Sequence, residues 1–166
     1  MKILHIILLS ALLFSNQSCK KERSNSENNV SCRINGIPFT NTKTISLFGS
    51  PSLHISNTSS NGFSLSASNF GDDQDPLNKN VIIRLNFIKT VGTYQLEELP
   101  NNASYEVSDT TSSLYTTDRN HQGEISFTVM DTVNHHYEGT FKFNAFWKQN
   151  GRSVNVTEGV FNFSEK

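Results

Sequence analysis

The chain has 166 residues, of which 35% are hydrophobic and 17% are charged, and its 14 Lys and Arg against 15 Asp and Glu leave a net charge of −1. This length corresponds to one domain of ordinary size with short appendages. The balanced charge excludes the clustered basic surface that binding to a phosphate backbone requires, so nucleic acid is not an expected partner.

Residues 1–18 are typical of a secretory signal peptide. Lys2 supplies a positive charge, residues 3–14 form an apolar run, and a short polar stretch ends at Ser18. The run is too short to remain as a transmembrane helix, which needs about 20 apolar residues. We therefore expect this segment to direct export and then to be removed.

The end of the signal resembles the lipobox of bacterial lipoproteins. Ser18 stands directly before Cys19, and Asn16 occupies the position where most lipoboxes carry an aliphatic residue, a relaxed pattern similar to that of Bacteroidota. The resemblance implies that Cys19 becomes the N-terminus and carries several acyl chains, which together anchor a protein stably. An ordinary signal peptide that leaves Cys19 as a free thiol is the alternative. We expect an exported lipoprotein of the outer membrane, on either its periplasmic or its surface face.

Residues 19–29 comprise the lipidated Cys19 and a polar tether. Residues 20–29 read KKERSNSENN and contain no apolar side chain. Such a segment has no burial to offset the entropy lost on ordering, so we expect it to be disordered. It would link the membrane to a globular domain that occupies residues 30–166.

The domain has the alternation of β-strands. From Val30 onward the apolar residues recur at a period of two, and Asn35-Gly36 predicts a type I′ turn between two strands. The apolar runs lie at residues 30–34, 37–39, 45–48, 53–55, 63–67, 81–87, 94–96, 105–107, 114, 125–129, 141–147 and 154–163. About ten strands separated by turns predict an all-β domain, built as an antiparallel β-sandwich or a barrel-like sheet.

The last run contains a change of parity. Val154 and Val156 are even-numbered, whereas Phe161 and Phe163 are odd-numbered, with Gly159 between the two sets. Without an irregularity, one of the sets would face solvent. The pattern therefore predicts a β-bulge near Gly159 that turns both sets towards the core.

Three stretches together resemble a Bacteroidota family of small lipoproteins with a β-sandwich-like domain of unknown function. They are CRINGIPFT at residues 32–40, VGTYQL at residues 91–96, and the closing YEGTFKFNAF and VNVTEGVFNF that begin at Tyr137 and Val154. The resemblance covers most of residues 30–164. It implies the fold and the location, and it brings no catalytic residues to this chain.

Candidate chemistry is sparse, and no catalytic, phosphate-binding or dinucleotide-binding motif occurs. Cys32 alternates with Val30 and Ile34, so we expect it to be a small buried hydrophobic residue. Asp72, Asp73 and Asp75 place several oxygen ligands in one loop, but their spacing does not match a calcium loop. We therefore expect no metal and no cofactor, with these three aspartates as weak candidates for calcium.

Aromatic side chains are the remaining candidates for ligand binding. Tyr137, Phe146 and Trp147 form the densest group, and alternation places Phe146 on the face opposite Trp147. The alternative is a purely structural role, in which all three belong to the core. We expect a non-enzymatic binding or interaction module, anchored in the bilayer through Cys19, whose partner is a glycan or an envelope protein. A small glycan-directed hydrolase and a structural or inhibitory lipoprotein are the alternatives.

Overall fold

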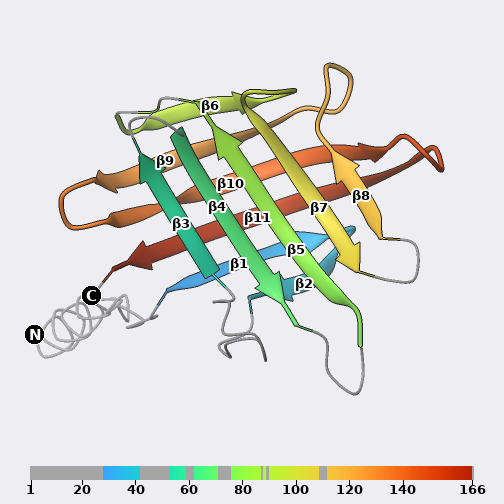
Figure 1. Ribbon diagram of the computed structural model, residues 1–166, viewed down its shortest axis with the longest axis horizontal. Helices are drawn as coiled ribbons and strands as arrows, with labels where there is room; N and C mark the ends of the chain where they lie inside the picture. Colours follow the sequence, from blue (N-terminus) through green and yellow to red (C-terminus); the bar gives the residue numbers. More distant parts are fainter. Residues whose placement is uncertain are drawn as a thin grey trace, which may run out of the picture.

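The computed structural model describes residues 28–41, 53–58, 62–70, 76–86, 88, 90–108 and 112–165, and these segments are all β (Figure 1). The eleven strands are β1 (Asn29–Ile34), β2 (Ile37–Thr40), β3 (Leu53–Thr58), β4 (Gly62–Asn69), β5 (Asn78–Leu85), β6 (Gly92–Leu96), β7 (Asn102–Ser108), β8 (Ser113–Thr116), β9 (Gly123–Asp131), β10 (His136–Trp147) and β11 (Arg152–Ser164). The run at residues 45–48, which was expected to be a strand, lies outside the described residues. Within the described part of the chain, no helix has the length and apolarity needed to cross a membrane.

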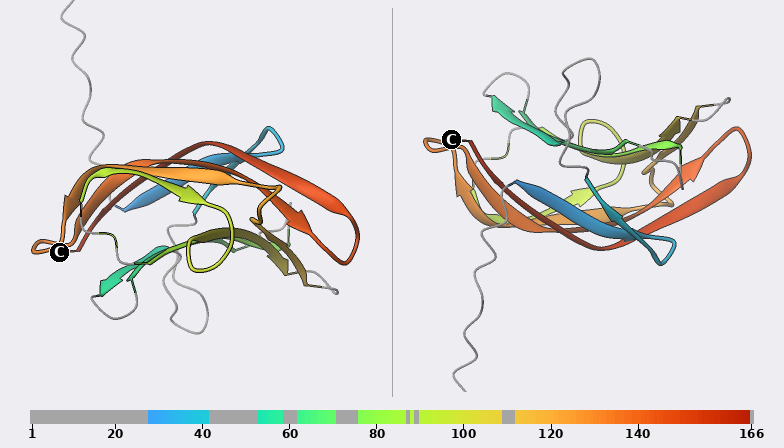
Figure 2. Two further views of the ribbon diagram at one scale, coloured as in Figure 1. Left: turned by 90° about the horizontal axis from the view of Figure 1, so that it is seen from above. Right: turned by 90° about the horizontal axis from the view of Figure 1, so that it is seen from below.

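All strand pairs are antiparallel and belong to one curled sheet with the order β2-β1-β11-β10-β8-β7-β5-β4-β3. Strand β9 pairs with β10, and β6 pairs with β9. Figure 2 shows that the curl brings β9, β10 and β11 to lie over β3, β4 and β5, so the apolar faces meet in the middle. The predicted all-β, barrel-like antiparallel fold is therefore confirmed as an eleven-stranded half-barrel.

The curl depends on β10, the second-longest strand. Its first two thirds pair with β9, from His136 to Phe143, and its far end pairs with β8 through Phe146 and Thr116. Strands β9 and β8 both pair with the same edge of β10, but at different positions along it, so the sheet branches at β10. One branch continues to β6 and the other to β3, which folds the two layers over a shared core.

The first hairpin has the turn that its sequence predicts. Asn35 and Gly36 both have positive φ angles, of 49° and 81°, as a type I′ turn requires. Asn35 also fastens the turn to β11: its N–H donates to the carbonyl of Asn155 at 2.8 Å, and its Oδ1 accepts the N–H of Asn155 at 2.9 Å. Both hydrogen bonds join Asn35 to Asn155, so the hairpin turn is held against β11.

The predicted β-bulge is confirmed in β11. Phe141 pairs with Gly159 and Phe143 with Val156, so one extra residue lies in β11 between these pairs. Glu158 has a φ of +52°, a left-handed conformation that a bulge accommodates. As a result Val156 and Phe161, on opposite sides of the bulge, are both fully buried.

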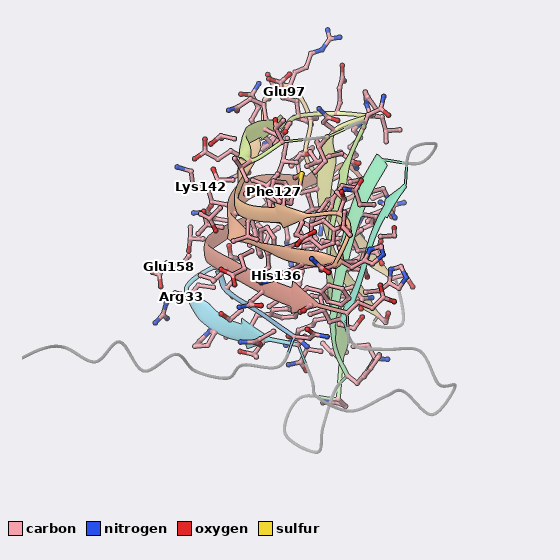
Figure 3. All side chains as sticks on the ribbon, turned by 90° about the vertical axis from the view of Figure 1, so that its left-hand side faces the viewer. Arg33, Glu97, Phe127, His136, Lys142 and Glu158 are labelled. Carbon is pink, nitrogen blue, oxygen red and sulfur yellow. The ribbon has the colours of Figure 1, made fainter. Side chains whose placement is uncertain are left out.

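Aromatic rings join the two layers. Phe63 of β4 packs edge-on against Phe127 of β9, with ring centroids 4.9 Å apart, and it also contacts Tyr137 of β10 at 5.8 Å. Phe127 in turn packs edge-on against Phe161 of β11 at 5.4 Å. Figure 3 shows Phe127 between the layers, whereas Arg33, Lys142 and Glu158 lie on the outer surface. Edge-to-face pairs of this kind add to the stabilisation that ring burial gives.

Two glycines in β10 and β11 make room for the rings of two phenylalanines. Gly139 pairs with Phe161 and Gly159 pairs with Phe141, so each phenylalanine lies opposite a glycine of the neighbouring strand. A Cβ at Gly139 would overlap the Phe161 ring and the carbonyl oxygen of Ser126, and one at Gly159 would overlap the Phe141 ring. The rings cover glycine backbone that would otherwise be poorly packed.

Gly139→Ala is therefore expected to lower the free energy of unfolding by about 3 kcal/mol, the upper end of the usual range for overpacking, because one obstacle is a backbone carbonyl that cannot rotate away. Urea unfolding of the purified protein measures this. Thr140→Ala, the next residue on the exposed face, is the control and should change stability by less than about 0.5 kcal/mol. Equal unfolding midpoints for the two variants would contradict the packing described.

Candidate functional site

An apolar groove of about 440 Å³ opens between the β1–β2 hairpin and strands β5, β7 and β8. Ile34, Ile37, Pro38 and Phe39 form the hairpin side. Leu77, Tyr105, Val107 and Tyr115 form the facing side, with Val154 of β11 between the two. The groove lies where the two layers of the half-barrel separate, so it is a continuation of the core that remains open to solvent.

The alternation of each strand explains the lining. Tyr105 and Val107 have the same parity as buried Ala103, so all three face inwards on β7. Phe39 and Tyr105 are only 4% and 7% exposed and form the floor, whereas Ile37 at the mouth is 68% exposed. Ile37 therefore extends the apolar lining of the groove to its solvent-exposed mouth.

An aromatic row extends from the groove. The rings of Tyr105 and Tyr115 have centroids 6.0 Å apart, and the ring of Tyr115 is 5.7 Å from that of Trp147. Trp147, a candidate from sequence, thus lies next to the groove wall without lining it. It is the one tryptophan of the chain, so its fluorescence reports on this region alone.

The other two aromatic candidates lie elsewhere. Phe146 is on the opposite face of β10 from Phe143, as alternation predicts, and its ring stacks on that of His121 at 4.7 Å. Tyr137 is 1% exposed within the core, and burial raises the pKa of its hydroxyl. Neither ring lines the groove, so the three aromatics do not form one binding platform.

Polar side chains border the mouth of the groove: Asn35 of the hairpin turn, Asn69 at the end of β4, and Lys79 of β5. The Asn69 amide donates to the carbonyl of Thr40 at 2.8 Å, which ties β4 to β2 across the open side of the half-barrel. The groove therefore combines an apolar floor with a small polar rim, the usual composition of a ligand site.

The groove lies at the end of the domain away from the expected tether. The chain enters β1 at Asn29, beside Ser164, whose N–H donates to Asn28 Oδ1 at 2.8 Å. Ile34, at the other end of β1, lines the groove. A six-residue strand is about 17 Å long at its usual rise. An anchored domain would thus be able to present this groove away from the membrane.

A second, more polar cleft brings two carboxylates together, Glu98 and Asp118. Paired-acid glycoside hydrolysis needs one carboxyl group with a raised pKa as proton donor. Hydrogen bonds from His121 and from the Asn120 N–H instead lower the pKa of Asp118. Glu98 is paired with Arg119 at 2.9 Å. The cleft therefore gives no support to the hydrolase alternative.

The remaining candidate residues from sequence are the possible metal ligands and the two cysteines. Cys19, Asp72, Asp73 and Asp75 lie outside the described residues. Among the described ones, no three His, Cys, Asp or Glu side chains gather closely enough to hold a metal ion. Cys32 is 5% exposed in the core, as its alternation predicts, and burial raises the pKa of its thiol to about 12. It is a packing residue and not a nucleophile.

Comparison with known families gives one match. A family model described as a domain of unknown function (DUF6252) matches residues 39–163. The matched region takes in β3 to β10 completely and nearly all of β11, so it includes most of the groove. No curated protein and no solved structure matches the chain.

Proposed function

The chain belongs to the DUF6252 family, a domain of unknown function, and we propose that it is a lipid-anchored protein of the outer membrane that binds another envelope protein through the apolar groove. The groove is the observation that carries the proposal. It is a preformed concave apolar surface, and Ile37 at its mouth is 68% exposed. Burial of one leucine- or phenylalanine-sized side chain there would contribute about 2 kcal/mol.

The composition of the groove favours a protein partner over a glycan. Sugars bind best on flat aromatic platforms with many hydrogen-bonding groups, whereas this groove is lined by five aliphatic side chains and a proline against three aromatic and three polar ones. Asn35, Asn69 and Lys79 at the rim are suited to the backbone of a bound segment. A glycan that contacts Tyr115 remains the second candidate, on the basis of the aromatic row alone.

The anchor supports the same proposal. Acylated Cys19 would confine the domain to the membrane surface, because the ten residues 20–29 that follow it can reach no farther than about 33 Å. A partner in the same envelope is then met at a high effective concentration, so a groove that takes only one or two side chains suffices.

The test of the groove uses the hydrophobic dye anilinonaphthalene sulfonate. We expect the dye to bind the folded protein and to quench the emission of Trp147 by energy transfer. The Trp147 ring lies 5.7 Å from that of Tyr115, which lines the groove, so a dye bound there is close enough for transfer. Ile37→Glu should weaken binding of the dye at least about fivefold, since it places a negative charge at the apolar mouth.

Val133→Glu is the matched control. Val133 is 84% exposed in the turn between β9 and β10, at the opposite end of the molecule, so the same charge there should leave binding unchanged. Equal loss of dye binding in both variants would show that charge in general is responsible. Equal binding by Ile37→Glu and the unsubstituted protein would exclude the groove as the apolar site.

A further inference from the structure

The polar cleft is a second surface, separate from the groove. It has a volume of about 470 Å³ and is lined by Arg84, Glu98, Asn102, Thr117, Asp118 and Lys148, among others. Thr116 lines the cleft and Tyr115 lines the groove. Because consecutive strand residues point to opposite faces, the two hollows lie on opposite sides of β8.

An unsatisfied amide lies in the wall of this cleft. Asn102 is only 9% exposed, and its Oδ1 is buried with no hydrogen-bond partner. Ser104, two residues further along the same face of β7, is 2% exposed and its Oγ also has no partner. Buried polar atoms are nearly always hydrogen bonded, so the Asn102 amide at the cleft wall has an acceptor available to a bound group or to water.

The charges of the cleft are unequal once their partners are counted. Glu98 is paired with Arg119 at 2.9 Å, and Asp118 is paired with His121 at the same distance. Arg84 and Lys148 have no ion pair within the described residues. Arg84, Lys148 and Arg119 thus carry three positive charges against the two negative charges of Glu98 and Asp118, so the surface keeps a small positive excess that favours an anion.

We propose that this cleft binds an acidic sugar residue, with its anionic group on Arg84 and Lys148 and a hydroxyl on the Asn102 amide. A hydroxyl both donates and accepts, so it satisfies that amide in either of its two orientations. Thr117 adds a hydroxyl donor: its Oγ1 accepts the Ala103 N–H at 3.0 Å, and no acceptor for its own proton occurs among the described residues. An anion without hydroxyls leaves the amide unsatisfied, and a neutral sugar leaves the cations unpaired.

Titration calorimetry of the purified protein tests this with four probes: D-glucuronate, glucose 6-phosphate, glucose and acetate. We expect glucuronate to bind in the millimolar range and to bind at least about tenfold more tightly than glucose or acetate, each of which carries only one of the two features. Comparison of glucuronate with glucose 6-phosphate shows whether the cleft prefers a carboxylate or a phosphate. A tenfold difference in affinity identifies the preferred acidic group.

Arg84→Gln should weaken glucuronate binding by about tenfold, because Arg84 is exposed and its loss removes an anion contact without disturbing the core. Lys142→Gln is the matched control: it removes a cation on the outer face of β10, where Lys142 pairs with Glu124 at 3.1 Å, and should leave binding unchanged. Acetate or glucose binding as tightly as glucuronate would overturn the proposal. So would the absence of binding up to about 10 mM, or an Arg84→Gln variant that binds normally.

Discussion

Cys19→Ala is expected to abolish lipid attachment and to remove the protein from the outer-membrane fraction. The effect should be complete, because in the proposed anchor the acyl chains on this one cysteine are the whole attachment, and residues 20–29 contain no apolar side chain that would hold the chain at a bilayer. Metabolic labelling with a radioactive fatty acid, followed by separation of the membranes, measures both parts of this expectation.

Cys32→Ala is the matched control, since it removes the other cysteine of the chain. Cys32 is 5% exposed within the core, where no lipid-transferring enzyme reaches it once the domain is folded. This variant should keep both the label and the membrane location. Label retained by Cys19→Ala, or lost from Cys32→Ala, would contradict the assignment of the anchor.

Cys32 itself is expected to react about a thousandfold more slowly than an ordinary thiol at pH 8. Burial raises its pKa from 9.0 to about 12, so the thiolate that attacks a disulfide reagent is about a thousandfold scarcer. In the Cys19→Ala protein Cys32 is the one remaining thiol, and its reaction with Ellman's reagent gives the rate directly. Rapid reaction without denaturant would contradict the burial of β1.

The same shift fixes how Cys32 affects the pH dependence of stability. Well below pH 9 the thiol is protonated in both the folded and the unfolded chain, so it has no effect. Between pH 9 and about 12 the unfolded chain releases its proton first, and stability should fall with rising pH. Cys32→Ala should remove this part of the alkaline decline in the unfolding free energy.

Local features of the fold could be predicted from sequence because each depends on residues that lie close together in the chain. Asn35-Gly36 carries its turn chemistry in two positions, and the bulge follows from the change of parity between Val156 and Phe161. The buried position of Cys32 follows from alternation in the same way. For the bulge and for Cys32 a period of two is sufficient, and no knowledge of which strands pair is needed.

The two hollows could not be predicted, because their linings come from distant parts of the chain. Ile34 and Val154 are 120 positions apart in sequence yet line the same groove, and Arg84 and Lys148 meet in the cleft only through the curl of the sheet. An apolar residue that lines a groove has the same strand pattern as one in the core. Tyr137 shows the converse, since sequence made it a ligand candidate and the fold buries it.

The most direct test of the groove as the contact surface of an envelope protein is photo-cross-linking in intact cells. A benzophenone side chain in place of Ile37, at the mouth of the groove, should give a discrete protease-sensitive adduct on illumination. The same side chain in place of Val133, which is 84% exposed at the far end, should give none. No adduct at position 37, an equal adduct at both positions, or an adduct made of sugar alone would contradict the account.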